Sequence, residues 1–313
     1  MSKIGLIDVD GHNFPNLPLM KLSAWHKQQG DSVEWYEPMF SGHMDRVYLS
    51  KVFGFTDDYL YHIDADEIIR GGTGYCIESV GGREIFHKEK NINLPDEIEH
   101  IYPDYSLYNI NDTAYGFLSR GCPRGCDFCH VKDKEGRKSY KVADLNEFWR
   151  GQKNIVICDP NLLACKESEN LLTQLIDSKA MIDINQGFDI RIMTERQADL
   201  ITKMRVKELH FAWDKYEEKD VILPKFKMFR EKSKMHRQLL IVYVLCNFNT
   251  TIEQDLERIY TLRDMGFNPY VMLYDKQSLE KGNIYKKLQR WVNNRFIFAS
   301  NERFEDFLEN KNK

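Results

Sequence analysis

The sequence contains no hydrophobic run that approaches the roughly 20 residues needed to cross a bilayer. Its first 14 residues include no apolar core followed by a cleavage site, so they do not resemble a secretory signal. A large excess of either charge is also lacking, because 44 basic and 48 acidic residues leave a net charge of −4. The overall charge therefore gives no indication of nucleic-acid binding. We therefore expect a cytoplasmic protein with no membrane partner.

Cysteine is sparse except at one place. The chain of 313 residues has seven cysteines, and three of them, Cys122, Cys126 and Cys129, lie within eight positions. An odd number in a chain of this length does not favour a disulfide framework, whereas a clustered triplet in a reducing compartment is typical of a metal site. The other cysteines are scattered and lack the spacing of a second such loop: Cys76, Cys158, Cys165 and Cys246.

Alternating strand and helix patterns predict an α/β fold. Residues 1–110 are expected to form a small Rossmann-like domain, with strands at 3–10, 32–37 and 45–53 and a helix within 15–31. Asn16 can cap that helix, and Gly30 can end it. A polar connection at 91–112, which contains proline, leads to the next domain.

After that connection, strand and helix patterns alternate regularly. This alternation predicts a partial (β/α)6 TIM-type barrel over residues 111–300, followed by a tail at 301–313. This array is two units short of a complete barrel. The expected strands are 113–119, 154–160, 181–187, 207–214, 238–247 and 268–275. The expected helices are 142–150, 166–178, 194–204, 221–233, 251–265 and 284–295.

Polar residues stand at the carboxyl ends of several predicted strands, where such folds collect their chemistry. These positions are the cysteine loop, Asp159, Asn161, Gln186 to Arg191, Asp214, Asn247 and Asp275. Each one alone can equally cap the following helix. Together, and beside a candidate metal-binding loop, they indicate a functional site at the carboxyl ends of the strands.

The cysteine triplet limits which metals the loop can bind. Thiolates select zinc, copper(I) or iron–sulfur clusters. A structural zinc needs four closed ligands, and here the fourth would be His130, directly beside Cys129, or a distant cysteine. A four-iron cluster is larger, so three thiolates from one short loop can hold three of its irons and leave the fourth open. Zinc remains the alternative.

The loop resembles the signature of the radical S-adenosylmethionine (SAM) superfamily, a C-x3-C-x-aromatic-C loop that follows the first strand of a partial barrel. Cys122, Cys126, Phe128 and Cys129 match it, and the resemblance extends over about 113–296. It implies a [4Fe-4S] cluster whose open iron chelates SAM. It also implies reductive cleavage to a 5′-deoxyadenosyl radical, with a flavodoxin or ferredoxin as electron donor. The substrate remains unidentified.

The resemblance also implies contacts to SAM. Phe128 would pack near the adenine. The segment at 158–163 lacks the glycines of the family's Gly-Gly-Glu-like motif, so Asp159 or Asn161 would contact the methionine amino group. Arg191 would meet the SAM carboxylate, and Asp189 or Gln186 the ribose or substrate. Asp214 is a weaker candidate for the same cavity.

Residues beside the cysteines also have expected roles. Gly121 and Gly125 permit the backbone conformations that turn N–H groups toward a negatively charged cluster. Arg120 and Arg124 would partly neutralise it, or they are simply solvated. The basic run at 132–141 would suit phosphates of a nucleotide or RNA substrate, or it is a solvated loop.

The first domain resembles the cobalamin-binding domains that precede some radical SAM barrels. Asp10, Gly11 and His12 begin the Asp-x-His-x-x-Gly motif, but Pro15 stands at the glycine position, which argues against cobalamin. Gly71, Gly72 and Gly74 could wrap a cofactor tail, as a glycine pair does in that fold, but a turn that ends a strand explains them as well. A degenerate domain used for substrate contact or docking is the preferred interpretation. The alternatives to a SAM-cleaving enzyme are a cobalamin-dependent or methylthiotransferase-like enzyme, and a non-catalytic iron–sulfur binding protein.

Overall fold

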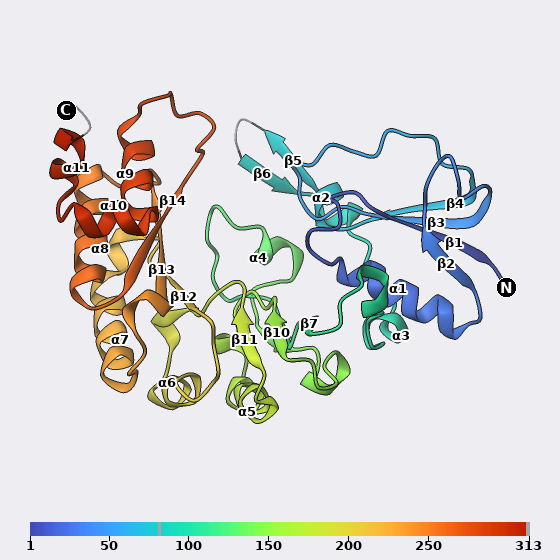
Figure 1. Ribbon diagram of the computed structural model, residues 1–313, viewed down its shortest axis with the longest axis horizontal. Coiled ribbons are helices and arrows are strands. Elements are labelled where there is room, and N and C mark those ends of the chain that lie inside the picture. Colours follow the sequence, from blue (N-terminus) through green and yellow to red (C-terminus); the bar gives the residue numbers. More distant parts are fainter. Residues whose placement is uncertain (81–82, 311–313) are drawn as a thin grey trace. The chain divides into compact units, whose positions relative to one another are not determined.

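The computed structural model describes residues 1–80 and 83–310. It divides the chain into two compact units, Met1–Pro160 and Asn161–Lys313. The predicted α/β class is confirmed, since helices alternate with mainly parallel sheets (Figure 1). The domain division after residue 110 stays a prediction. Of the predicted tail, Phe304–Asn310 form helix α11, and residues 311–313 lie outside the described part.

A four-stranded parallel sheet forms the centre of the first unit, in the order β2-β1-β3-β4. Its strands are β1 (Lys3–Asp8), β2 (Ser32–Trp35), β3 (Met44–Ser50) and β4 (Ala65–Gly71). Strand β1 is buried at four consecutive positions, as expected of a central strand covered on both faces. The strands predicted at the start of the chain are therefore confirmed, with shorter bounds.

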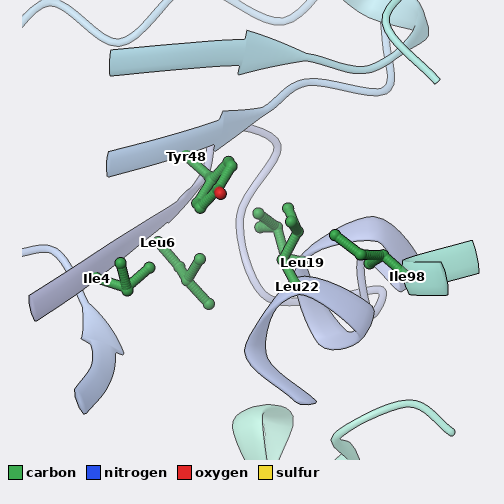
Figure 2. Packing of buried hydrophobic residues seen from close by; sticks show 6 residues of the cluster. All are labelled: Ile4, Leu6, Leu19, Leu22, Tyr48 and Ile98. Atoms are coloured by element: carbon green, nitrogen blue, oxygen red, sulfur yellow. The ribbon is translucent and has the colours of Figure 1, made fainter. Parts of the chain in front are cut away.

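Helix α1 (Leu17–Gln28) covers one face of this sheet. The Asn16 side chain caps it by accepting a hydrogen bond from the Leu19 amide, and Gly30 follows its end with φ +83°. Figure 2 shows the core on this side, where α1 and helix α3 (Asp96–Glu99) face strands β1 and β3. The cluster consists of Ile4, Leu6, Leu19, Leu22, Tyr48 and Ile98. A second cluster of buried residues includes Ile7, Tyr36, Met44, Val47, Leu49 and Ile63.

One pair of short strands precedes the cysteine loop in the sequence, and a second pair flanks it. After helix α2 (Thr73–Cys76), strands β5 (Ile77–Val80) and β6 (Arg83–Phe86) form an antiparallel pair that the sequence analysis did not predict. Strand β7 (Thr113–Gly116) then pairs in parallel with β10 (Asn154–Ile157). The carboxyl ends of β7 and β10 therefore lie side by side, at the point where the cysteine loop and Asp159 follow them.

The helix predicted at 142–150 is wrong. Only a single 3-10 turn, Leu145–Glu147, forms there. Phe148 leaves the helical region with φ −130° and is buried at 4% exposure. A Cβ at Gly116 would lie 2.5 Å from the Phe148 ring, so this ring occupies the space that glycine leaves open on β7. Tertiary packing thus ends the helix after one turn.

The second unit contains strand β11 (Met181–Ile184) and a parallel sheet in the order β12-β13-β14. These three strands are Leu209–Ala212, Leu240–Cys246 and Asn268–Leu273. Its helices are α5 (Ser168–Ser178), α6 (Glu195–Ile201), α7 (Lys219–Lys232), α8 (Ile252–Asp264), α9 (Ile284–Asn293), α10 (Arg295–Ser300) and α11. Rings of Phe211, Phe226, Phe229 and Phe267 pack together in its core.

Two further features concern the whole fold. The sheets of the described residues do not close into a complete barrel. Within residues 1–80 and 83–310, no helix combines the length and apolar character that a transmembrane span requires.

Candidate functional site

The cysteine loop is closed at its base. Strand β8 (Ser119–Arg120) precedes it and pairs antiparallel with β9 (Tyr140–Lys141), which follows it. Within the loop, the Cys122 amide donates to the Gly136 carbonyl at 3.2 Å, and the Cys129 amide donates to the Cys126 carbonyl at 3.1 Å. Helix α4 (Val131–Lys134) begins two residues after the third cysteine. The three cysteines are therefore carried by a backbone with its own internal hydrogen bonds.

Glycine is required at the start of this loop. Gly121 has φ +79°, and a Cβ there would collide with the carbonyl of Lys138. Gly125 is also crowded, because its Cβ would lie 3.0 Å from Nη1 of Arg137. The structure thus places the guanidinium of Arg137, a member of the basic run at 132–141, beside the loop.

The donor set of the loop consists of three thiolates, ligands that iron–sulfur clusters use. Cys122, Cys126 and Cys129 are half-buried. Within the described residues, no three His, Cys, Asp or Glu side chains are close enough to hold one metal ion. Burial and the neighbouring Cys122 raise the pKa of the Cys129 thiol, so cluster binding has to remove that proton.

Asp159 lies at the carboxyl end of β10 and is fully buried. The amides of Leu118 and Ser119 donate to its two carboxylate oxygens, each at 2.7 Å, and the Ser119 hydroxyl donates at 2.6 Å. Burial raises its pKa to about 6, although these hydrogen bonds act in the opposite direction. The structure therefore directs this carboxylate at the segment before the cysteine loop, and the predicted contact with SAM gains no support.

Arg120 is half-buried and has two contacts near the base of the loop. Its Nη1 donates to Glu135 at 2.9 Å, and its guanidinium lies 3.5 Å from the centre of the Phe117 ring. The second carboxylate oxygen of Glu135 accepts a hydrogen bond from the Gly121 amide at 2.9 Å. Sequence reasoning missed Glu135, because nothing in the sequence marks a carboxylate that pairs with residues 14 or 15 positions earlier.

The basic run at 132–141 is partly used in folding. Lys134 is half-buried and donates to the Thr73 hydroxyl at 2.7 Å, and burial lowers its pKa. Lys141 forms an ion pair with Asp144 at 2.6 Å. Arg137 is exposed. The predicted contact of the run at 132–141 with phosphates stays a prediction.

The remaining predicted SAM contacts belong to the second unit. The Asn161 amide donates to Asp189 at 3.2 Å. Asp189 forms an ion pair with Arg191 at 2.6 Å, and Arg191 reaches Glu218 at 2.7 Å. The two carboxylates raise the pKa of Arg191 further despite its burial. The structure thus brings Asn161, Asp189 and Arg191 together, whereas Gln186 is exposed on the preceding turn.

Asp214 follows β12 in the same unit. Burial raises its pKa to about 6, against the opposing influence of Arg191 and Arg258. Arg258 is itself fully buried and donates to the carbonyls of Trp213 and Asp214. Asp214 therefore shares the electrostatic surroundings of Arg191, as expected for residues at neighbouring strand ends.

Asp10 and His12, which begin the cobalamin-type motif after β1, both make contacts within the first unit. Asp10 accepts hydrogen bonds from the amides of Val52 and Phe53 and from the Thr56 hydroxyl. The ring of His12 stacks on Trp35 with the centroids 4.2 Å apart. Gly72 has φ +99°, and its Cβ would lie 2.3 Å from the Lys51 carbonyl oxygen, so a close backbone approach explains it without a cofactor.

Comparison with known proteins bears on this arrangement. No family model matches the chain. A solved structure of TsrM, a radical S-adenosylmethionine methyltransferase from Kitasatospora setae with cobalamin and a [4Fe-4S] cluster bound, has a TM-score of 0.60 over 87% of this chain and 75% of that one. The resemblance to the radical SAM superfamily is confirmed at the level of the fold. At 11% identity, this likeness establishes the fold, and the bound groups are those of TsrM.

A second relative is known from its sequence. A CDK5RAP1-like protein from Oryza sativa subsp. japonica is 24% identical over 153 residues, which are 44% of this chain. The chain spans about a quarter of that relative, since the match covers 25% of its length. What these two proteins do is therefore only a source of hypotheses about this chain.

Proposed function

We propose that this protein is a radical SAM enzyme in which Cys122, Cys126 and Cys129 hold a [4Fe-4S] cluster. The observation that carries the proposal is the glycine-dependent loop with three cysteines at the carboxyl end of β7, directly beside the end of β10. When bound, such a cluster supplies the electron that cleaves SAM into methionine and a 5′-deoxyadenosyl radical. A flavodoxin or ferredoxin would deliver that electron.

The chain's own residues would bind and orient SAM. Phe128 lies in the loop and would pack against the adenine. Arg191 is held by Asp189 and Glu218, so its guanidinium is fixed in direction and suited to the carboxylate of SAM. Asn161 and Gln186 would contact the remaining polar groups. Asp159 would act on the loop instead of on SAM.

The finer architecture belongs to the same proposal. We infer that β7, β10, β11, β12, β13 and β14 with their helices form the partial (β/α)6 barrel predicted over residues 111–300. The parallel pairing of β7 with β10 and the parallel order β12-β13-β14 support it. The first 110 residues would form the smaller Rossmann-like domain around the sheet β2-β1-β3-β4.

Anaerobic reconstitution tests this function. Purified protein is supplied with iron and sulfide, reduced with dithionite, and assayed for 5′-deoxyadenosine formed from SAM. We expect product from the wild type and none from Cys126→Ala. Cys76→Ala is the matched control, because Cys76 is a buried cysteine outside the loop. A wild-type protein that binds iron but no SAM contradicts the proposal, and one zinc in a colourless protein supports the structural-metal alternative.

A cobalamin-assisted methyl transfer is the second candidate. The sheet order β2-β1-β3-β4 favours it, since this order places a ligand site beyond the carboxyl ends of β1 and β3. The partners of Asp10 and His12 at this edge oppose it, because both side chains already have contacts within the unit. Hydroxocobalamin added to the protein and followed by its visible spectrum after gel filtration decides between them. We expect no retained cobalamin.

A further inference from the structure

Two carboxylates accept hydrogen bonds from the segment that leads into the cysteine loop. Asp159, following β10, binds the amides of Leu118 and Ser119 and the Ser119 hydroxyl. Glu135, following α4, binds the Gly121 amide and the Arg120 guanidinium. Three backbone N–H groups within residues 118–121 are thus fixed by charged side chains. We call these two side chains the loop clamp.

The loop clamp supplies charge-assisted hydrogen bonds to a segment that has few backbone hydrogen bonds between strands. Hydrogen bonds to a carboxylate are stronger than those between neutral groups. Strand β8 has only two residues, and the antiparallel pair β8–β9 supplies few backbone bonds. Asp159 is fully buried, and the side chain of Glu135 is 11% exposed, so water competes little for either. The conformation of residues 118–121 therefore depends on both carboxylates.

We propose that Asp159 and Glu135 are positioning residues for the cluster: they fix the backbone before Cys122, so that the three thiolates face a common centre. The inference rests on the proposed function for the identity of the cluster. Its structural half, the ordering of residues 118–121, concerns this chain alone. Neither residue is assigned a contact with SAM or with the cluster.

Amide substitutions test the loop clamp with little change in shape. In Asp159→Asn, an NH2 group would face the N–H donors of Leu118 and Ser119, so at least one hydrogen bond is replaced by a clash of donors. Glu135→Gln does the same at Gly121 and Arg120. Asp104→Asn is the matched control, because Asp104 also accepts hydrogen bonds from a backbone amide, hydroxyls and a cation, but at the start of the turn Tyr105–Tyr108.

Hydrogen exchange measured on the protein without iron gives the first result. We expect the amides of Leu118 and Ser119 to exchange about tenfold faster or more in Asp159→Asn, and that of Gly121 in Glu135→Gln. In Asp104→Asn, these three amides should exchange as in the wild type. Equal exchange in all four proteins overturns the inference. If Asp159→Asn does not fold, Glu135→Gln alone decides it.

Reconstituted protein gives the second result. We expect both clamp variants to retain less than about half of the wild-type iron and to show an altered electron paramagnetic resonance spectrum of the reduced cluster, whereas Asp104→Asn keeps both. Iron content and spectrum equal to those of Asp104→Asn overturn the positioning role. If the wild type itself takes up no iron, the proposed function fails, and the exchange rates decide on the loop clamp independently.

Discussion

Gly121 lies so close to Lys138 that a Cβ added to the glycine would stand 2.1 Å from the Lys138 carbonyl oxygen. The two residues lie on the two backbone segments that close the cysteine loop. Gly121 also has φ +79°, a conformation that costs other residues about 1–2 kcal/mol. Sterics and backbone conformation therefore require glycine independently at the position before Cys122.

Gly121→Ala should thus open the base of the loop. We expect the variant to lose most of its capacity to bind iron, because the Lys138 carbonyl and the chain that carries it have to move. Gly136→Ala is the control, since Gly136 also has a positive φ of +90° but open space around its Cβ. It should lose only about 1 kcal/mol of stability and keep its iron. Iron analysis after reconstitution checks both, and equal iron in the two variants contradicts the prediction.

A buried histidine joins helix α1 to the first sheet. His26 is 2% exposed, and its ring nitrogens lie 2.9 Å from Asp31 and 3.0 Å from the Tyr48 hydroxyl. Tyr48→Phe removes this hydroxyl but keeps the ring in the core. We expect the free energy of unfolding to fall by about 1 kcal/mol, measured by urea denaturation. Tyr61→Phe, at an exposed position, should change it little; a Tyr48→Phe variant as stable as wild type contradicts the role of the bond.

The sequence predicts strands better than it predicts where strand-end side chains point. Alternation of apolar stretches and helical patterns locates the six strands between residues 113 and 275, because each of these strands buries side chains at alternating positions. The partners of Asp159 are the N–H groups of Leu118 and Ser119, which lie 41 and 40 residues earlier in the chain. No local pattern encodes that direction.

Other misses have a local cause. The stretch at 142–150 has a helical pattern and even the capping pair Asp144 and Glu147, but Phe148 packs against Gly116 and ends the turn. The β5–β6 pair is different, since Gly81 and Gly82 between two β-prone stretches are a known hairpin signal. The sequence therefore carries a local signal for this pair of strands.

The pair of Asp255 and Arg258 within α8 is completely buried. Arg258 also donates to the carbonyls of Trp213, Asp214 and Leu245, so it connects α8 to the ends of β12 and β13. Asp255→Ala leaves this guanidinium without its charge partner and should lower the free energy of unfolding by about 3–5 kcal/mol. Asp264→Ala, at an exposed position of the same helix, should cost less than about 0.5 kcal/mol. Thermal unfolding measures both, and similar melting temperatures would refute the prediction.

Asp214 makes the stability of the protein depend on pH in an unusual direction. Its pKa is raised from 3.8 to about 6 by burial, so the folded state keeps a proton between about pH 4 and 6 that the unfolded chain releases. Because the folded state then binds more protons, stability falls as the pH rises through this interval. A shift of this size corresponds to about 2–3 kcal/mol. Asp214→Asn cannot lose a proton and should remove this contribution.

The measurement compares urea unfolding of the wild type and Asp214→Asn at several pH values from 4 to 7. The variant should gain stability relative to the wild type as the pH rises to about 6, after which the difference stays constant. Asp220→Asn, an exposed carboxylate on α7, is the control and should run parallel to the wild type. A difference between wild type and Asp214→Asn that does not change with pH would show that the carboxyl of Asp214 is ionised in the folded protein. Arg191 and Arg258 would then outweigh the effect of burial.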